Sequence, residues 1–387
     1  MFVKSKYTSF NNAIKFDFEK NEIYHDYMNV SKSLRGIPNI HVYIKKFSFL
    51  NNKSEYIIDL LKLIYLILFP FFLVYKFFSF FYYINFKYNG VDLDNVYLGL
   101  SEDKYFASID SKKCENFPET YVVFNQKRKA SLKDNQINII NFKDLITFKD
   151  LVKTLISSFY CQFKLSDKQF YIFFTYCSFD WFLTYTVLKR LKPNQIWISN
   201  HYDRWTVLSN DIAKTILVQH GVLYFKDYQN KVLFPSFSIK LNNIFKIFHS
   251  DDSSPKYFKR YINNSILIFE KIIIKTTVID WSEKNRILII GNKMLEKDHV
   301  KLIDRCSKEF NDLKFAYKYH PLQQKKINTL YDIKHIFNKN EIIDSDFIIS
   351  YGSSIDLEIK RKLNSRIITI TDFKDISPKS FRIMLNV

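Results

Sequence analysis

The chain has 387 residues, of which 47% are hydrophobic, and a formal net charge of +19. That length accommodates two domains with full-sized cores, and that hydrophobic fraction excludes an intrinsically disordered protein. The lysines are scattered, without a compact arginine-rich block. The charge therefore favours an anionic membrane surface or a phosphorylated ligand and argues against nucleic acid as a partner.

The cysteines and the first residues indicate the compartment. Cys114, Cys161, Cys177 and Cys306 lie far apart and form no CxxC pair, which argues against a disulfide scaffold and against a zinc site. The first residues are polar and do not form the apolar core of a signal peptide. We therefore expect a protein of the reducing cytoplasm.

Residues 1–90 are predicted to form an N-terminal region, with a polar, irregular lead and an apolar segment at 57–84. In that segment thirteen uncharged residues, 63–75, separate Lys62 from Lys76, whereas a spanning helix needs ~18–20 apolar residues. Pro70 is expected to kink the helix. Three interpretations remain open: a buried helix or helix pair, a helix lying in the membrane interface, or a span whose two lysines reach the headgroups.

Residues 91–282 show apolar runs alternating with helical patterns, which predicts a parallel, doubly wound sheet and an α/β fold class. Thr147 is a candidate N-cap for the first helix, and Pro193 is expected to end the second. The expected strands are 121–125, 137–141, 170–176, 195–199 and 215–218, and the expected helices are 148–159, 181–191 and 205–214.

Polar residues follow three of these predicted strands. Asp180 comes after 170–176, Asp203 and Arg204 come after 195–199, and His220 comes after 215–218. The carboxyl ends of parallel strands lie on one edge of a sheet, where open α/β proteins bind their ligands. We therefore expect all three polar clusters on that edge.

Residues 283–387 resume the alternation and predict a second α/β unit. The expected strands are 286–290, 313–319, 347–350 and 366–370, and the expected helices are 296–310 and 355–363. The two units together predict two doubly wound domains in one chain.

Two neighbouring strand ends of the second unit carry the most specific pattern in the chain. His320-Pro321 follows 313–319, and Gly352-Ser353-Ser354 follows 347–350 just before a helical stretch. Free N–H groups and serine hydroxyls at a helix start bind phosphate. Because the chain has only six glycines, we expect Gly352 to stand where the backbone turns tightly or approaches a ligand. The two loops predict one pocket for a nucleotide's phosphate.

These motifs resemble those of bacterial surface-polysaccharide transferases of the GT-B architecture, in which two Rossmann-like domains face a cleft. That group includes sialyl-, polysialyl- and Kdo-transferases and the CDP-glycerol glycerophosphotransferases. Its pattern is matched by His320-Pro321, by Ser345, Asp346, Ser350, Ser353 and Ser354, and by His220-Gly221. The resemblance covers about 165–371. It implies an acceptor domain at 91–282 and a nucleotide-donor domain at 283–387.

The resemblance also implies roles for single residues. His320 is expected to contact the donor phosphate and to protonate or hydrogen-bond the leaving nucleotide, which suits an imidazole near neutral pH. Hydroxyl and backbone N–H groups of the serine turn are expected to bind the same phosphate. The expected donor-binding residues are Pro321, Ser350, Gly352, Ser353 and Ser354.

The catalytic base is expected in the first domain. Asp203 and Asp180 are equivalent candidates for deprotonating the acceptor hydroxyl, although an Asp203 paired with Arg204 would be a structural carboxylate. His220 is a further candidate, as a base, a phosphate contact, a contact to the acceptor hydroxyl or a structural histidine.

Asp344-Ser-Asp346 mimics the metal-binding DxD motif of the other glycosyltransferase fold class. Because it precedes a buried strand that leads into Gly352, we interpret it as the entry to that strand. We expect no metal and no cofactor other than a nucleotide-sugar substrate, CMP- or CDP-linked on the basis of the resemblance.

The expected function is sugar transfer from a nucleotide-activated donor to a glycan or glycolipid hydroxyl in capsule, lipooligosaccharide or other bacterial surface-glycan synthesis. The enzyme is expected to be metal-independent and peripheral at the inner face of the cytoplasmic membrane. Two alternatives stay open. One is a polyol-phosphate transferase that uses CDP-glycerol or CDP-ribitol, and the other is a non-catalytic GT-B-like scaffold of polysaccharide assembly.

Overall fold

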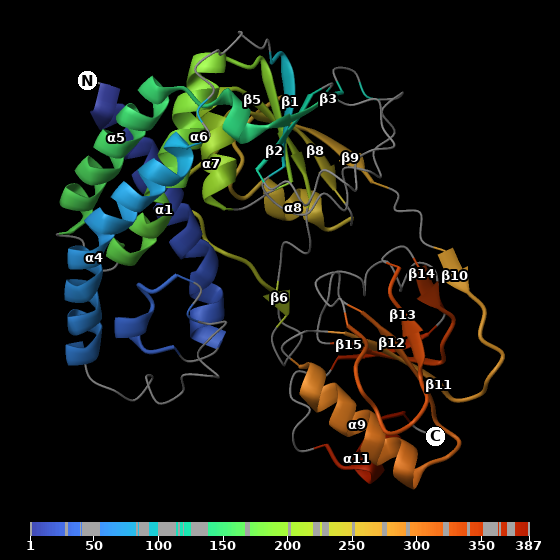
Figure 1. Cartoon of the computed structure of the whole chain (residues 1–387). Coiled ribbons are helices and arrows are strands. Elements are labelled where there is room, and N and C mark those ends of the chain that lie inside the picture. The colour runs from blue at the N-terminus through green and yellow to red at the C-terminus, as the bar shows by residue number, and fades with distance from the viewer. Residues whose placement is uncertain are drawn as a thin grey trace. The chain divides into compact units, whose positions relative to one another are not determined.

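The computed structural model divides the chain into two compact units, Met1–Ile272 and Ile273–Val387, called unit 1 and unit 2 below (Figure 1). Residues 1–27 and 55–81 belong to unit 1 together with its sheet. The structure describes residues 2–27, 30–38, 40, 55–82, 84, 93–99, 114, 117–118, 120–124, 138–166, 171–199, 203–219, 225–226, 232–249, 252–272, 277–291, 295–319, 325–338, 341–350, 363, 365–369 and 376–385.

Unit 1 is built on a seven-stranded sheet in which every neighbouring pair of strands is parallel. Its strand order is β3-β2-β1-β4-β5-β8-β9. Apolar runs with few polar residues form the central strands, because helices cover both faces of a parallel sheet. The strands are β1 Asn95–Gly99, β2 Thr120–Val123, β3 Asn138–Asn141, β4 Gln195–Ile198, β5 Lys214–Val218, β8 Ile244–His249 and β9 Ile268–Lys271.

The helices of unit 1 include most of those predicted from the sequence. The predicted cap is confirmed: Thr147 Oγ1 accepts from the N–H of Asp150 at 3.2 Å, and the Asp150 carboxylate accepts from the N–H of Thr147 at 3.0 Å. The α-helices are α1 Phe2–Tyr27, α4 Glu55–Phe81, α5 Phe148–Ser166, α6 Ser178–Leu191, α7 Arg204–Ile212 and α8 Ser254–Phe258. The 3-10 helices are η1 Lys32–Leu34, η5 Phe142–Leu145 and η6 Ile172–Cys177, and β6 Phe225–Lys226 pairs with β7 Val232–Leu233.

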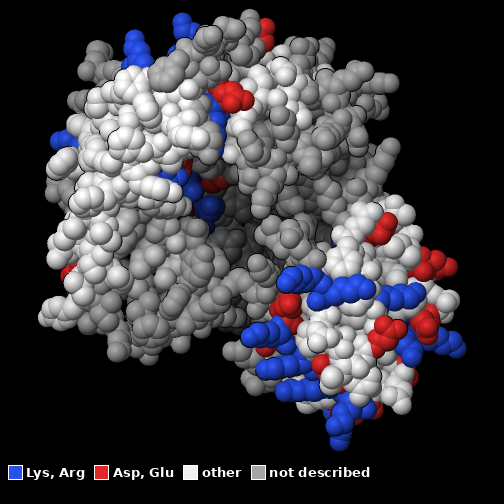
Figure 2. Space-filling model, viewed as in Figure 1, with Lys and Arg blue, Asp and Glu red and all other residues white. Residues whose placement is uncertain are grey.

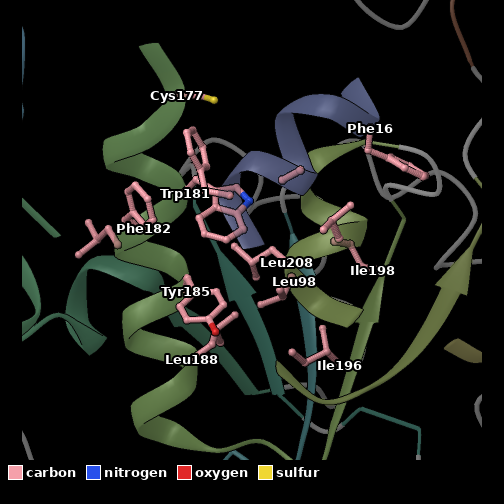
Figure 3. Packing of buried hydrophobic residues seen from close by; sticks show 14 of the residues in the cluster. Phe16, Leu98, Cys177, Trp181, Phe182, Tyr185, Leu188, Ile196, Ile198 and Leu208 are labelled. Atoms are coloured by element: carbon pink, nitrogen blue, oxygen red, sulfur yellow. The ribbon is translucent and has the colours of Figure 1, made fainter. Parts of the chain in front are cut away.

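The core of unit 1 lies between the sheet and helices α1, α6 and α7. Figure 3 shows Trp181 and Tyr185 of α6 in one cluster with Leu208 of α7 and with Leu98 of the sheet. Trp181 is fully buried, and its indole Nε1 donates to the carbonyl of Arg204 at 3.1 Å. This hydrogen bond joins the start of α7 to α6.

The prediction of an irregular lead was wrong, because residues 2–27 form the helix α1. Phe10, Ala13 and Phe16 are fully buried in the same core as the sheet. Phe10 packs on Trp181 with ring centroids 5.2 Å apart, and Phe16 stacks on Phe237 at 4.0 Å. The first helix is therefore part of unit 1.

Polar residues on the buried side of α1 hid the helix from the sequence pattern. Each of these side chains reaches a partner far along the chain, so its burial costs less than that of an unpaired polar group. The pairs are Lys6 with Thr186, Ser9 with Asp211, Asp17 with Arg204, and Glu19 with Ser238.

The predicted strand at 170–176 was also wrong. Residues 172–177 form η6, which continues directly into α6. The run is apolar because it is buried, and periodicity alone does not separate a short buried strand from a buried helical turn. Consequently Asp180 lies in the first turn of α6 and not at the end of a strand.

α4 is one continuous helix across Pro70, so the proline does not interrupt the helix. Proline has no N–H to donate to the carbonyl four residues earlier, which here belongs to Leu66. Gln162 of α5 donates its Nε2 to that carbonyl at 3.2 Å. A neighbouring side chain thus replaces the hydrogen bond that Pro70 removes.

Unit 2 has a five-stranded parallel sheet in the order β13-β12-β11-β15-β16. The predicted strands of this unit are confirmed at 286–290, 314–318, 347–350 and 366–369, and the first helix at 296–309, whereas residues 355–362 of the second lie outside the described residues. The elements are β10 Thr277–Ile279, β11 Arg286–Ile290, α9 Glu296–Glu309, β12 Lys314–Lys318, β13 Lys334–Ile336, β14 Glu341–Ile343, β15 Phe347–Ser350, β16 Arg366–Thr369 and α11 Pro378–Leu385, with β10 paired to β14.

Candidate functional site

The strand order of unit 2 defines where a ligand crevice belongs. From the central strand β11 the chain builds β12 and β13 on one side and then crosses to build β15 and β16 on the other. This is the order of a Rossmann sheet, whose crevice opens at the carboxyl ends of the strands where the order reverses. In unit 2 that point lies between β11 and β15, next to Gly291 and Ser350.

The two predicted phosphate loops start at this edge. His320 comes two residues after β12, and Gly352 two residues after β15, but His320-Pro321 and Gly352-Ser353-Ser354 lie outside the described residues. The ends of β12 and β15 were predicted to be neighbours. Each of these strands pairs with β11, which therefore lies between them. Their ends are separated by two strand spacings, about 10 Å.

The residues just before His320 are held firmly. Tyr319 stacks on Phe337 with centroids 4.1 Å apart, and its hydroxyl is hydrogen-bonded to Nδ1 of His335 at 2.8 Å. The same hydroxyl accepts from the N–H of Ile327 at 2.7 Å. The buried Lys318 donates its Nζ to the carbonyl of Asn338 at 3.1 Å. The start of the His320 loop is thus fixed by the core of unit 2.

Ser350 is the one predicted donor-binding residue that the structure describes. It ends β15, it is buried, and it pairs in register with Thr369 of β16. Its place at the carboxyl end of β15 agrees with the predicted edge.

Unit 1 has the same kind of switch point, between β1 and β4. β1 ends at Gly99, where an added Cβ would lie 2.6 Å from the ring of Tyr121. A glycine is therefore required at the end of β1, although the sequence analysis did not single it out. β4 leads into Ser199 and then to Asp203, with residues 200–202 outside the described residues.

Asp203 is the N-cap of α7. Its Oδ1 accepts from the N–H of Trp205 at 2.8 Å and from the N–H of Thr206 at 3.3 Å. A carboxylate in this position compensates the positive end of the helix. The neighbouring Arg204 pairs with Asp17. The cap gives Asp203 a structural role, which was one of the two roles left open for this carboxylate.

Asp180 forms an ion pair with Lys76 of α4. Nζ of Lys76 in α4 lies 3.0 Å from Oδ2 of Asp180. The pair ties the first turn of α6 to α4, and the Asp180 side chain is 40% exposed. Asp180 and Asp203 therefore have separate structural partners, and the structure does not bring the two together as equivalents.

His220 follows β5 and lies outside the described residues. The residue before it, Gln219, is fully buried and donates its N–H to the carbonyl of Phe248 at 2.8 Å. β5 is next to β4 in the sheet, so the His220 loop and the Asp203 loop begin on adjacent strands. Of the three polar clusters predicted for this edge, the one with Asp203 follows β4 on it, whereas His220 itself lies outside the described residues.

The sequence analysis missed the charged cluster around Arg204. Nη1 of Arg204 lies 2.9 Å from Oδ2 of Asp17, and the N–H of Arg204 donates to Oδ1 at 3.0 Å. Nη2 donates to the hydroxyl of Tyr176 at 3.0 Å, and burial raises the pKa of that hydroxyl, with Arg204 opposing the rise. The cluster anchors the first turn of α7 beside the switch point. No local signal in the sequence links Asp17 to a residue so far along the chain.

The carboxylates of the DxD-like motif are bound by Arg286. Nη2 of Arg286 lies 2.9 Å from Asp346 and Nη1 lies 2.8 Å from Asp344. Hydrogen bonds from Arg286 hold the pKa of Asp346 below its usual range. Among the described residues, no group of three or more His, Cys, Asp or Glu is placed to hold a metal ion.

Comparison with known proteins adds little to this geometry. No family model matches the chain, and no curated protein matches it. Among solved structures, the crystal structure of the GtfA/B complex is similar over 52% of this chain and 52% of its own, at 10% identity and a TM-score of 0.29. This chain thus matches about half the length of that protein. At that TM-score the likeness carries no argument, so the site is interpreted from its own residues.

Proposed function

We propose that the chain is a glycosyltransferase that takes a sugar from a nucleotide-activated donor, with CMP- or CDP-linked sugars favoured. One observation carries the proposal: the order of the unit 2 sheet starts the Gly352 loop at its switch point and the His320 loop on the same edge, two strands from the Gly352 loop. The GT-B arrangement, with unit 1 holding the acceptor, is part of the proposal. So is a place in bacterial surface-glycan synthesis, with a glycan or glycolipid hydroxyl as acceptor.

In the proposed reaction the acceptor oxygen forms a bond to the anomeric carbon as the bond to the donor phosphate breaks. N–H and hydroxyl groups of Ser353 and Ser354 stabilise the departing phosphate, and His320 donates a proton or a hydrogen bond to it. His220 is the preferred base for the acceptor proton. Of the alternatives, Asp203 caps a helix and Asp180 pairs with Lys76.

The test is donor binding and turnover by the full chain. Thermal shifts with CMP, CDP, UDP and GDP identify the nucleotide, and release of that nucleotide from its sugar conjugates measures turnover. His320→Ala is expected to lower turnover by about 10²-fold or more, and Ser353→Ala with Ser354→Ala to weaken donor binding. Lys297→Ala, on the exposed side of α9, is the control.

Several outcomes would overturn this proposal. Unchanged turnover in His320→Ala removes the assignment of the site. Nucleotide binding without turnover of any sugar conjugate favours the scaffold, and transfer of glycerol phosphate or ribitol phosphate from the CDP conjugate favours the polyol-phosphate transferase. Turnover that is lost with EDTA and restored by Mg²⁺ or Mn²⁺ excludes the metal-independent reaction.

A further inference from the structure

The helix α4 has one face in the core of unit 1 and one face exposed. Phe69 and Leu73 are buried in the main core, and Ile58 is buried in a small cluster with Leu34. On the opposite side large apolar residues recur along the whole helix. They are Leu60, Leu61, Leu63, Ile64, Ile67, Leu68, Phe71, Val74, Tyr75, Phe78 and Phe81, of which Phe71 is 71% exposed.

The two lysines of α4 lie away from that exposed face, and Asp59, which is 64% exposed, stands at its N-terminal end. Lys76 lies three residues after the buried Leu73 and pairs with Asp180 of α6, so it points towards the protein. Lys62 lies seven residues before Phe69, on the same side of the helix, and pairs with Asp59 at 3.0 Å. From Leu60 to Tyr82 the exposed face thus carries no charged side chain. A continuous apolar surface of this length marks an interaction site.

The neighbouring helix α5 extends the apolar face and borders it with cations. Phe148, Ile156 and Phe163 are 47%, 55% and 75% exposed, and the Phe148 ring packs against Phe77 and Phe81 of α4. Lys149, Lys153 and Lys164 lie along the same helix on the adjacent strip of its surface, on the side further from α4. Figure 2 shows mostly white surface where Figure 1 draws α4.

By length and composition α4 is also able to cross a membrane, and 17% of its most apolar window is buried. Its contacts favour a different orientation, because polar groups tie it sideways to unit 1. Gln162 holds the carbonyl of Leu66, and Tyr65 is hydrogen-bonded to Thr175 at 2.8 Å. A spanning α4 would break these bonds and the Lys76–Asp180 pair, leaving polar groups in hydrocarbon.

A second copy of the chain fits this face less well than lipid. The exposed residues cover a broad arc of α4 and continue onto α5, whereas a helix pair buries a narrow stripe. Two copies meeting here would also bring two rows of lysines together, which is repulsive. A broad apolar face bordered by lysines instead matches the acyl boundary and the anionic headgroups of a bilayer.

We propose that α4 lies in the plane of a membrane, with its exposed face and that of α5 in the boundary between headgroups and acyl chains. Lys149, Lys153 and Lys164 contact anionic headgroups. Unit 1 stays on the aqueous side, held to α4 by the contacts described above. The proposal is independent of the transferase reaction and does not rest on it.

Flotation of the full chain with vesicles tests the membrane contact. Phosphatidylcholine vesicles containing phosphatidylglycerol are expected to bind the chain more tightly than phosphatidylcholine alone. Ile67→Ser with Phe71→Ser is expected to weaken binding by about tenfold or more, because both side chains would leave the acyl boundary. Leu330→Ser with Ile383→Ser, which changes two residues of unit 2 that are 85% and 73% exposed, is the matched control.

A charge exchange tests the border of the face. Lys149→Glu with Lys164→Glu is expected to weaken binding to the anionic vesicles by about tenfold and to leave binding to phosphatidylcholine nearly unchanged. The control is Lys297→Glu with Lys308→Glu, which makes the same charge change on exposed lysines of α9. Equal losses in the two variants would show that net charge, and not this face, attracts the membrane.

Depth measurements separate an in-plane helix from a span. The four native cysteines are buried, so a cysteine introduced for Leu60, Phe71 or Tyr82 can be labelled selectively with a fluorophore. Quenching by brominated lipids is expected to place all three labels at the same shallow depth. A deep label at 71 with shallow labels at 60 and 82 would overturn the proposal in favour of a span. A stable dimer that ignores vesicles would overturn it in favour of a second copy.

Discussion

Replacing Asp17 with alanine is the sharpest test of how α1 is held in unit 1. The Asp17 side chain is 8% exposed and pairs with Arg204, whose side chain is 20% exposed. One carboxylate oxygen accepts a hydrogen bond from the guanidinium, and the other accepts one from the backbone N–H of Arg204 at the start of α7. Asp17→Ala removes the carboxylate paired with the guanidinium and leaves this N–H without its acceptor.

The expected loss follows from the burial of the pair. Removing one partner of a buried ion pair costs about 3–5 kcal/mol, because the other charge stays desolvated. Arg204 keeps its hydrogen bond to Tyr176 and its position 5.3 Å from the centre of that ring, which reduces the loss. We expect about 3 kcal/mol for Asp17→Ala and about 1–2 kcal/mol for Asp17→Asn, which retains an acceptor for the N–H.

Urea unfolding followed by tryptophan fluorescence measures this loss. Three of the four tryptophans lie in unit 1, and Trp281→Phe removes the one in unit 2. Asp26→Ala is the matched control, since Asp26 pairs with Arg35 at 2.7 Å but is 69% exposed. A pair of that exposure contributes about 1 kcal/mol or less. If Asp17→Ala costs no more than Asp26→Ala, the pair does not hold α1 in place.

Two further predictions concern unit 2, with stability measured by urea unfolding. Burial lowers the pKa of His299 to about 4, so the folded state keeps this imidazole neutral while the unfolded state gains a proton below about 6.5. Stability should therefore fall as the pH drops from about 6.5 to 4, by up to about 3 kcal/mol, and His299→Gln should flatten this dependence; an unchanged slope would contradict it. Asp346→Ala should cost about 1–2 kcal/mol, less than Asp17→Ala, because Asp346 is 37% exposed and screened by solvent. A loss as large as that of Asp17→Ala would show that solvent exposure does not determine how much each carboxylate contributes to the free energy of unfolding.

The sequence predicted strands both at the sheet edges, where β3 and β16 lie, and at the sheet centres, although it missed β1. β4, β5, β11, β12 and β15 all fall within one or two residues of their expected positions. Each is buried on both faces, so its residues read as a continuous apolar run. β8 was missed because its sequence, Ile-Phe-Lys-Ile-Phe-His, lies in a stretch with turn signals on both sides.

Long-range partners explain what the sequence did not reveal. α1 buries Lys6, Asp17 and Glu19, and the partners that make this burial tolerable lie in α6, in α7 and at Ser238. A pattern that counts polar residues as exposed predicts no buried helix there. In the same way, the pairing of Asp344 and Asp346 with Arg286 depends on strands that adjoin only in the folded sheet.

The same distinction between local signals and long-range contacts applies to the candidate site. The sequence located the strand ends where the His320 and Gly352 loops start, because apolar runs and turn residues are local signals. It did not give the order of the strands, which puts β11 between those loops. The roles of Asp180 and Asp203 likewise depended on neighbours, Lys76 and the first turn of α7.

The docking of α1 also depends on residues that are synthesised much later than α1 itself. Ser9 of α1 bonds to Asp211, 202 residues later, and Phe10 packs on Trp181. At about 5–20 residues per second, a ribosome takes roughly 10–40 s to make that partner after α1 has emerged. During that interval Phe10, Ala13 and Phe16 have no core to enter. α1 is therefore buried only after the residues that cover it, as far as Asp211, have been synthesised.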